Sequence, residues 1–195
     1  MSLTFTEENH EYCWNGKPVV SVTQVLKPLT KLWTNGADLE RARQEGRAIH
    51  RMVELECKGE LDRESLPEWL QPIYAEWLKF VAMTGFELRL SEKPLYHRTY
   101  AYAGTPDLDG ILTKVKGKPF AVIDVKRTLG SKTNVFQTAA YEKLLSQDDG
   151  IHRRRVGLQL NPPRFPEYEN PNDWADFLTC LSWHRLQQRM GGAVK

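Results

Sequence analysis

Apolar residues recur at three- and four-residue spacing in several stretches of the chain, which is the pattern of a helix with one buried face. The longest such stretch runs from Asp38 to about Lys58, with Ile49, Met52 and Val53 in its apolar stripe. Similar stretches predict helices over Val22–Leu26 (capped by Ser21, stopped by Pro28), from near Pro67 (capped by Ser65) to just before Gly85, over Ser131–Ser146, and over Pro171–Met190.

Shorter apolar runs beside turn residues predict strands. Asn15-Gly16 marks a hairpin turn near the N-terminus. Phe86–Tyr96 alternates as a strand does, and Pro94 indicates an edge or an irregularity within it. Arg153–Leu160 predicts a late strand, whereas the consecutive prolines after Asn161 predict a loop. The order of the core elements, α–β–β–β–α–β, indicates an α/β fold with a mixed central β-sheet flanked by α-helices.

The stretch from Tyr102 to Thr128, YAGTPDLDGILTKVKGKPFAVIDVKRT, predicts two adjacent strands that carry charged residues. Asp124 and Lys126 share a face because successive strand residues point to opposite sides, and Asp107 and Asp109 share a face on the neighbouring strand. Ionised groups among buried apolar residues are costly unless they are paired or bind a metal. The stretch therefore places carboxylates and an ammonium together at a sheet edge, which suits a hard cation.

A structural ion pair between Asp124 and Lys126 is the plain alternative, because D-x-K triplets are common by chance. The context favours chemistry: Pro106-Asp107 after a turn, a short hairpin, and then Asp124-Val125-Lys126 at the end of an apolar strand. This order resembles the PD-(D/E)XK nuclease superfamily. The resemblance spans roughly residues 21–160 and implies a restriction-endonuclease-like core with a mixed four-stranded sheet. We expect one nuclease domain over residues 1–195, with the N-terminal hairpin and the C-terminal helix appended to that core.

Further motifs resemble the RecB-like, phage-type exonuclease branch of this superfamily. Gly46 and His50 match its G-x-x-x-H motif, in which the histidine is a metal ligand, and Gln137 and Tyr141 match its Q-x-x-x-Y motif. From the residues alone, a helical histidine is more often a packed or surface group, Gly46 hints at a close approach, and Gln137 and Tyr141 could be interfacial. Glu92 occupies the place of a glutamate in RecB-like relatives, with an exposed strand residue as the alternative.

The resemblance implies a role for each residue at the site. Asp107 and Asp124, with His50 and the Val125 carbonyl, would hold one or two Mg²⁺ or Mn²⁺ ions. Lys126 would orient the attacking water or help to deprotonate it. The catalytic candidates are Lys126, Asp124, Asp107 and Glu92; the candidates for binding DNA or orienting the site are Gln137, Tyr141, Arg43, Arg47, Arg127 and Lys132. Asp109 would lie about 7 Å along the strand from Asp107, and whether Glu92 or Asp109 reaches the metal stays open.

Composition narrows the function further. The chain has 195 residues and a net charge of only +2, so any nucleic-acid contact must be local rather than spread over a polycation. Its three cysteines, Cys13, Cys57 and Cys180, are widely separated and argue against an iron–sulfur centre. No Walker-type nucleotide motif and no apolar run of transmembrane length is visible. We therefore expect an intracellular, cytoplasmic protein with no bound nucleotide and no membrane association, and the resemblance implies a phage or prophage origin.

The function expected from the resemblance is a metal-dependent DNA exonuclease that leaves 5′-phosphate products, in recombination, repair or phage DNA processing. Its partners would be DNA with a free end and, in this branch, a single-strand-annealing or recombination protein or further copies of the chain. Two alternatives stay open. One is an endonuclease of the same superfamily, either restriction-type or junction-resolving, and the other is a catalytically silent DNA-binding module. Strand preference and polarity do not follow from the sequence.

Overall fold

A computed structural model describes residues 2–6, 9–30 and 36–191. Its central sheet has five strands in the order β10-β9-β8-β7-β4. Strands β4, β7 and β8 are antiparallel neighbours, whereas β8 and β9 are parallel. The predicted mixed α/β fold is confirmed, with five strands in the sheet rather than four. The strands are β4 (Phe86–Ser91), β7 (Leu108–Leu112), β8 (Phe120–Lys126), β9 (Arg154–Leu160) and β10 (Pro163–Arg164).

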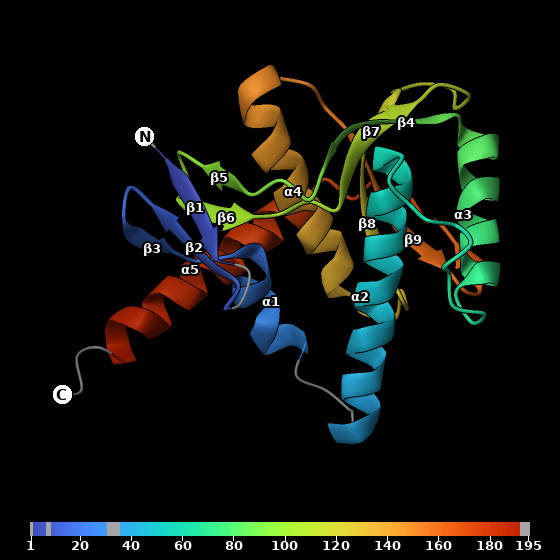
Figure 1. Cartoon of the computed structure of the whole chain (residues 1–195). Helices are drawn as coiled ribbons and strands as arrows, with labels where there is room; N and C mark the ends of the chain where they lie inside the picture. The colour runs from blue at the N-terminus through green and yellow to red at the C-terminus, as the bar shows by residue number, and fades with distance from the viewer. Residues whose placement is uncertain (1, 7–8, 31–35, 192–195) are drawn as a thin grey trace.

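Two small sheets lie beside the central one (Figure 1). The N-terminal sheet contains β1 (Leu3–Thr6), β2 (Glu11–Trp14) and β3 (Lys17–Val19), and the second contains β5 (Leu95–His97) and β6 (Tyr102–Gly104). The turn between β2 and β3 has positive φ at both Asn15 (49°) and Gly16 (75°). Two successive residues of this kind form the tight turn that matches strand twist, so the predicted hairpin is confirmed.

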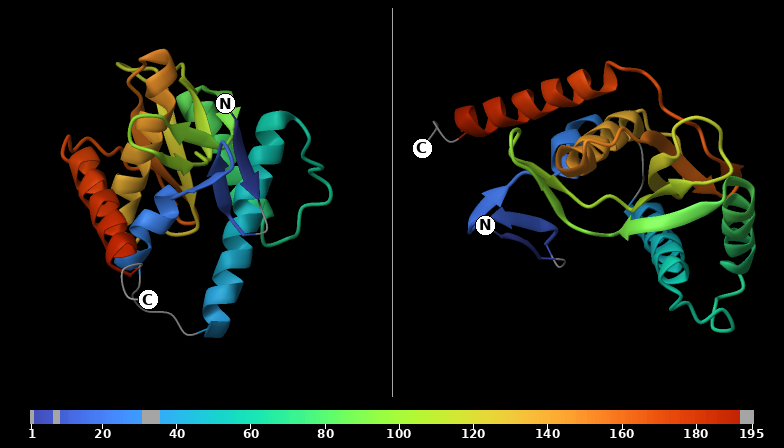
Figure 2. Two further views of the ribbon diagram at one scale, coloured as in Figure 1. Left: turned by 90° about the vertical axis from the view of Figure 1, so that its left-hand side faces the viewer. Right: turned by 90° about the horizontal axis from the view of Figure 1, so that it is seen from above.

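Helices cover both faces of the central sheet (Figures 1 and 2). Helices α2 and α3 lie on one face, while α1 and α4 lie on the other with α5 packed outside α4. Among the described residues, none of these helices is apolar over a length that would cross a bilayer. The helices are α1 (Val22–Thr30), α2 (Gly36–Lys58), α3 (Gln71–Thr84), α4 (Thr133–Asp149) and α5 (Asp173–Gly191).

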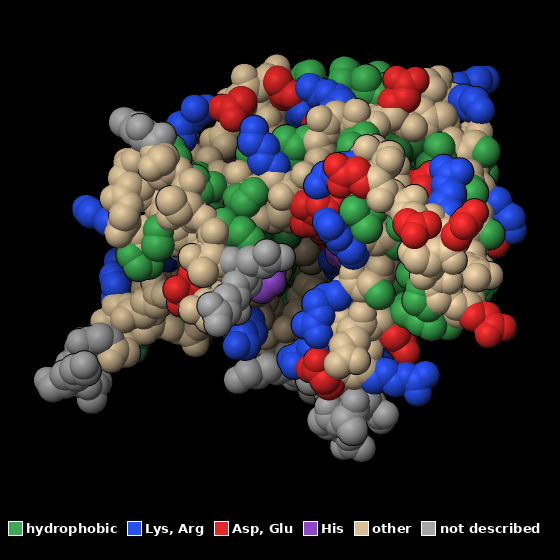
Figure 3. Space-filling view, in the orientation of Figure 1, with side chains coloured by type: hydrophobic (Ala, Val, Ile, Leu, Met, Phe, Trp, Pro, Cys, Tyr) green, Lys and Arg blue, Asp and Glu red, His purple; other side chains and the backbone are tan. Residues whose placement is uncertain are grey.

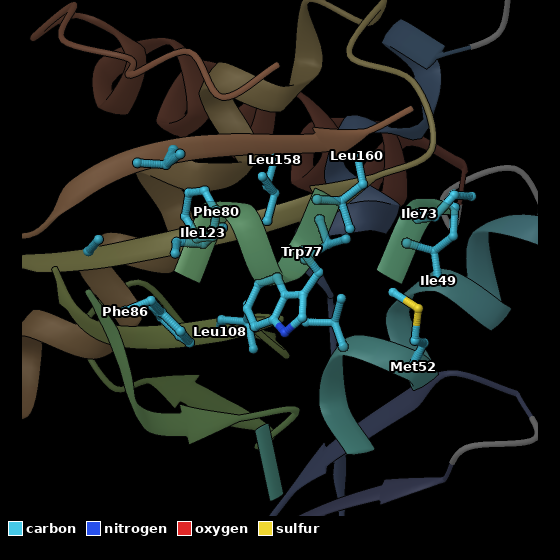
Figure 4. Packing of buried hydrophobic residues seen from close by; sticks show 14 of the residues in the cluster. Ile49, Met52, Ile73, Trp77, Phe80, Phe86, Leu108, Ile123, Leu158 and Leu160 are labelled. Carbon is cyan, nitrogen blue, oxygen red and sulfur yellow. The ribbon is translucent and has the colours of Figure 1, made fainter. Parts of the chain in front are cut away.

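One apolar cluster fills the space between the central sheet and helices α2 and α3 (Figure 4). Ile49 and Met52 of α2 and Trp77 of α3 are at most 3% exposed and pack toward strands β7, β8 and β9. Burying a side chain of this size stabilises the fold by about 1.5–3 kcal/mol. The cluster confirms the apolar stripe predicted for α2 and fixes that helix beside the end of β8.

A second apolar cluster joins the opposite sheet face to α1, α4 and α5. Val122 of β8, Leu144 of α4 and Phe177 of α5 are all fully buried in it. Because Val122 and Asp124 are two residues apart on β8, Asp124 faces this second cluster rather than the first. The C-terminal end of β8, which carries Asp124 and Lys126, thus lies between α2 on one side of the sheet and α4 on the other.

Three predicted element boundaries are wrong. Helix α1 continues past Pro28 to Thr30, although Ser21 does cap it, accepting the Gln24 N–H through Oγ at 3.1 Å. Helix α3 begins at Gln71, which places Pro72, with no N–H to donate, in the first turn; its N-cap residue is Leu70, whose apolar side chain cannot cap it. The predicted strand from Phe86 is two strands in different sheets, β4 and β5, separated by Glu92, whose φ is +48°.

The stretch after β9 also differs from its prediction as a loop. Pro163 and Arg164 form β10, which pairs antiparallel with Leu160 and Gln159. A proline is tolerated here because β10 is the edge strand and its outer side needs no ladder donor. This short strand is the fifth member of the central sheet.

Candidate active site

Asp107 lies where β6 leads into β7. Its Oδ2 accepts a hydrogen bond from the backbone N–H of Val125 on β8 at 2.7 Å, and the residue is 9% exposed. The bond runs from the beginning of β7 to the end of β8, two strands that pair antiparallel. It fixes the Asp107 carboxylate beside the C-terminal end of β8, the middle strand of the sheet, rather than on an edge strand.

Asp124 and Lys126 form an ion pair at the end of β8, with Lys126 Nζ 2.8 Å from Asp124 Oδ1. Burial raises the pKa of Asp124, and the neighbouring Lys126 ammonium opposes that rise. For Lys126, burial lowers the pKa, but the carboxylates of Asp124 and Asp107 outweigh burial and raise it overall. The Lys126 side chain is 24% exposed while that of Asp124 is fully buried. A charged ammonium therefore faces outward from a buried carboxylate.

Three side chains from separate elements converge beside this pair. His50 of α2, Glu92 of the bend between β4 and β5, and Asp107 each place one ligand atom within 4.8 Å of the others. His50 Nδ1 lies 3.6 Å from Asp107 Oδ2 and 3.8 Å from Glu92 Oε1. Donors about 2.1 Å from an octahedral ion are about 3 Å apart, so a small contraction would seat one divalent cation. The donor set of one imidazole and two carboxylates suits Mn²⁺, and Mg²⁺ less well.

The electrostatics of the cluster also fit a cation. Burial lowers the pKa of His50, but the negative charges of Asp107 and Glu92 outweigh burial and raise that pKa to about 9. In the absence of a metal, His50 is thus protonated at neutral pH and supplies a positive charge between two carboxylates. A divalent cation would replace the proton in the same field, since ligation requires the neutral imidazole.

Asp124 and Val125 are placed differently from the other metal-ligand candidates. Asp124 is outside the three-residue cluster: its Oδ1 accepts from Lys126, and its Oδ2 is buried with no hydrogen-bond partner in the described part of the chain. Val125 has its side chain in the core and donates its backbone N–H to Asp107. Of the sequence candidates, the structure thus brings His50, Glu92 and Asp107 to one point. Ligation by Asp124 or by the Val125 carbonyl stays a prediction.

Gln137 and Tyr141 lie one turn apart on α4, as their spacing predicts. Gln137 Nε2 donates to the Tyr141 hydroxyl at 3.0 Å. Tyr141 is 4% exposed, and burial raises its pKa well above the ordinary value, with the charges of Asp124 and Asp107 adding to the rise. Tyr141 is therefore a buried neutral phenol that the Gln137 amide orients and on which the charges of both carboxylates act, and a role at the site stays a prediction.

Asp109 of β7 is bound to Arg153, which directly precedes β9, the second strand along the sheet from β7. Arg153 Nε donates to Asp109 Oδ1 at 2.6 Å, and Arg153 Nη2 donates to Asp149 Oδ2 at 2.6 Å. The side chains of Arg153 and Asp109 are 1% and 4% exposed. Between Glu92 and Asp109, the two candidates for the remaining carboxylate, only Glu92 belongs to the potential metal cluster.

The Arg153 network predicts an acid-dependent loss of stability through Asp149. Its hydrogen bonds with Arg153 lower the pKa of Asp149 to about 2. A carboxylate with a depressed pKa stabilises the fold above its ordinary pKa of about 3.9 and loses that contribution as the pH falls toward 2. We expect Asp149→Asn to be less stable than wild type by a constant amount above pH 4.5, with the difference shrinking between pH 4 and pH 2. Urea denaturation across this range measures it, and a difference independent of pH would contradict the assignment.

Arg43, Arg47 and Arg127 lie around the cluster on exposed positions. Arg43 and Arg47 lie seven and three residues before His50 along the same side of α2, and their side chains are 60% and 68% exposed. Arg127 follows Lys126 directly and reaches Glu45 of α2 at 3.3 Å. Lys132, also exposed, is the residue before α4. Their role in binding phosphate stays a prediction.

Figure 3 shows a hollow in the surface between the N-terminal sheet and α2, with Lys and Arg side chains gathered along the α2 side. Elementary electrostatics makes such a wall attractive to a phosphate backbone. The face of α2 that carries His50 also carries Arg43 and Arg47, because these residues are spaced at helical intervals. The basic side of the hollow therefore continues along α2 toward His50 of the three-residue cluster.

The sequence interpretation missed two polar groups at the site. The Tyr12 hydroxyl is 2.8 Å from Thr105 Oγ1, two residues before Asp107. On the other side, Tyr168 lies beside Asn134 of α4, and its pKa is raised by burial and further by the charge of Asp124. Gly157 could have indicated Tyr168, because an isolated glycine in a buried strand marks a close approach.

Gly157 pairs with Asp124 across β8 and β9, and a Cβ built on it would lie 2.4 Å from the Tyr168 hydroxyl and 2.8 Å from Leu129 Cδ2. We expect Gly157→Ala to lower the free energy of unfolding by about 1–3 kcal/mol and to displace Tyr168. Gly46→Ala is the control, since no described atom lies within 4 Å of an added Cβ there and alanine favours the helix. The close approach expected at Gly46 is thus absent from the described chain. Equal urea midpoints for the two variants would contradict this account of Gly157.

Comparison with known proteins gives a limited result. No family model matches the chain, and no curated protein matches it. Among solved structures, the chain is similar to a crystal structure of a "putative exonuclease" from Eubacterium rectale, with 11% sequence identity and a TM-score of 0.47. That similarity covers 93% of this chain and 79% of the other. Likeness at this level assigns no function, so the site itself has to carry the proposal.

Proposed function

We propose that this protein is a metal-dependent DNA nuclease of the PD-(D/E)XK type that acts as an exonuclease. The observation that carries the proposal is the convergence of His50, Glu92 and Asp107 beside the buried Asp124–Lys126 pair. A purely structural ion pair explains Asp124 and Lys126 alone. It does not explain why two further carboxylates and an imidazole from three other segments meet next to that pair at a cost in like-charge repulsion.

The chemistry required is the hydrolysis of a phosphodiester. Water adds to phosphorus, the P–O3′ bond breaks, and the products are a 5′-phosphate and a 3′-hydroxyl. His50, Glu92 and Asp107 would hold the cation, with Asp124 adding negative charge beside them. When bound, a divalent cation lowers the pKa of the water that it coordinates and neutralises negative charge on the scissile phosphate.

Lys126 and the residues behind it have a distinct part in this scheme. Because the pKa of Lys126 is raised, its ammonium suits orientation of water and stabilisation of negative charge on the phosphate better than it suits removal of a proton. Asp124 holds the ammonium through Oδ1, and the bond from Val125 N–H holds Asp107. Gln137 and Tyr141 would keep this arrangement in place from α4.

The test is digestion of three DNA substrates by purified protein with Mn²⁺ or Mg²⁺: end-labelled linear single strands, end-labelled linear duplex, and covalently closed circular duplex. We expect loss of linear DNA with 5′-phosphate products and survival of the circle, because an exonuclease needs an end. Cutting of the circle would replace the exonuclease assignment by an endonuclease. Binding of DNA with all three substrates intact would make the chain a silent DNA-binding module.

Occupation of the site by metal has a readout that does not depend on activity. We expect Mn²⁺ to raise the melting temperature of the wild-type protein by about 5 °C, since a ligand that binds only the folded state stabilises it by mass action. His50→Ala and Glu92→Gln should lose most of this shift because each removes one of the converging ligand atoms.

His184→Ala is the matched control for the metal titration, since His184 lies on α5, outside the cluster. Its Mn²⁺-dependent shift should equal that of the wild type. If His50→Ala keeps the full shift while activity is lost, the cation is bound elsewhere and the ligand assignment is wrong.

A further inference from the structure

The N-terminal sheet presents a row of aromatic rings on one face. In its register Phe5 pairs with Tyr12, and Leu3 pairs with Trp14, so these four side chains point to the same side. The ring centroids of Phe5 and Tyr12 are 4.7 Å apart, and those of Phe5 and His10 are 5.5 Å apart. We call Tyr12, Phe5 and His10 the aromatic row. Burial decreases along it, because Tyr12 is buried, Phe5 is partly buried and His10 is exposed.

The buried end of the aromatic row is attached to the candidate active site. The Tyr12 hydroxyl bonds to Thr105, two residues before Asp107, and the charge of Glu92 acts on the same hydroxyl. On the same face Trp14 stacks on Tyr96 of β5, with centroids 4.4 Å apart and ring planes at 17°. These two contacts fix the N-terminal sheet relative to the candidate active site. The aromatic row therefore runs outward to solvent from the side of the cluster formed by His50, Glu92 and Asp107.

The wall opposite the aromatic row has the complementary chemistry. Figure 3 shows the hollow between the N-terminal sheet and α2, with basic side chains along α2. Arg43 and Arg47 lie on the side of α2 that carries His50 and are largely exposed; both pair with the one carboxylate of Glu40, at 3.7 and 3.1 Å, which leaves a net positive charge. One wall therefore suits phosphates and the other suits flat apolar rings, with the cluster of His50, Glu92 and Asp107 between them. A single nucleic-acid strand has complementary groups for both walls, because its phosphates run along one side and its bases project from the other.

We propose that the Phe5 and His10 rings stack on the bases of a single-stranded DNA end whose phosphates follow α2 into the site. In a duplex the base faces are covered by the stacked neighbouring base pairs and pairing holds the bases in that stack, so the aromatic row selects single strands or unpaired ends over blunt duplex. Base–aromatic stacking tolerates any sequence because every base has a π face. This inference rests on the proposed nuclease function and adds its substrate class.

The test separates the base contribution from the phosphate contribution. Binding of a fluorescein-labelled twelve-residue oligothymidylate is compared with that of the same backbone carrying abasic residues, in EDTA so that no hydrolysis occurs. We expect the wild type to bind the normal strand roughly tenfold more tightly than the abasic one. Phe5→Leu, which keeps an apolar side chain in the sheet, and His10→Ala should bind the two strands nearly equally, whereas Phe5→Trp should keep the preference.

Thr6→Ala is the matched control, because Thr6 is exposed on the opposite face of the same strand. Its preference for the normal strand should equal that of the wild type. Equal binding of normal and abasic strands by the wild type, or an unchanged preference in both Phe5→Leu and His10→Ala, overturns the inference. Hydrolysis of the linear substrates is scored separately with Mn²⁺. Hydrolysis without base preference contradicts only the stacking inference, whereas base preference without hydrolysis of any substrate supports base stacking and contradicts the nuclease function.

Discussion

Replacing Lys126 with methionine is expected to reduce DNA hydrolysis by about a thousandfold, the range in which a positioned charged group contributes to catalysis. Methionine keeps the unbranched apolar stem and removes only the ammonium. The loss follows because the Lys126 side chain, held by Asp124 at 2.8 Å, is the positive charge exposed beside the cluster. Initial rates on end-labelled linear DNA measure the effect.

The variant also leaves the fully buried Asp124 without its partner, so lost activity has to be separated from lost folding. Breaking one side of a buried pair is expected to cost about 3–5 kcal/mol, whereas neutralising both sides costs much less. The double variant Lys126→Met with Asp124→Asn should therefore recover stability in urea denaturation and remain inactive. Activity near the wild-type level in a folded Lys126→Met protein would remove Lys126 from the catalytic set.

Arg153→Met is expected to lower the free energy of unfolding by about 3–5 kcal/mol. Arg153 is almost completely buried and bonds to Asp109 and Asp149. Without it, Arg89, whose Nη1 is 3.5 Å away, is the one cationic partner left to the buried Asp109 carboxylate among the described residues. Urea denaturation with the midpoint and slope fitted together measures the difference.

Arg98→Met is the matched control, because Arg98 pairs with Asp148 on the surface and both side chains are about 60% exposed. Exposed pairs contribute less than about 1 kcal/mol, so this variant should be close to wild type. Replacing Asp109 with leucine in the Arg153→Met background should recover much of the loss, since no buried charge then remains unpaired. Equal destabilisation by Arg98→Met and Arg153→Met would show that burial of the Arg153 network has no energetic importance.

Sequence reasoning worked best where the relevant distance along the chain is short. Asp124 and Lys126 are two residues apart on one strand, and Gln137 and Tyr141 are four apart on one helix. Periodicity fixes the relative direction of such side chains before any tertiary contact is known. Their mutual contacts, 2.8 Å and 3.0 Å, follow from secondary structure alone.

The convergence of His50, Glu92 and Asp107 required more than periodicity. These residues lie on α2, in the bend after β4 and before β7, and no local rule relates the three segments. The family resemblance supplied the expected pairing of histidine and aspartate, and it offered Glu92 without deciding its role. The bend at Glu92, with φ of +48°, ends β4 and directs that carboxylate into the cluster.

Contacts set by strand register could not be predicted. Asp109 meets Arg153 because β8 runs antiparallel to β7 and parallel to β9, which brings residues 44 positions apart into contact. Tyr168 reaches the site for a similar reason, since its segment lies along β9 and its backbone N–H donates to the Arg155 carbonyl. A one-residue change of register would reverse these directions, and the hydrophobic pattern alone does not give the register between distant strands.

Helix α2 has 23 residues, yet among residues 40–58, whose side chains the structure describes, the buried ones, such as Ile49, Met52 and Val53, all belong to the C-terminal half. Residues 40–48 have no buried side chain, and this half projects beyond the sheet (Figure 1). The C-terminal half of the helix, which packs against the sheet, therefore sets the position of His50, whereas the more exposed N-terminal half carries Arg43 and Arg47. In the proposed nuclease, substitutions at Arg43 and Arg47 would change substrate reach and salt sensitivity at little cost in folding, so substrate choice and metal chemistry could evolve separately along one continuous helix.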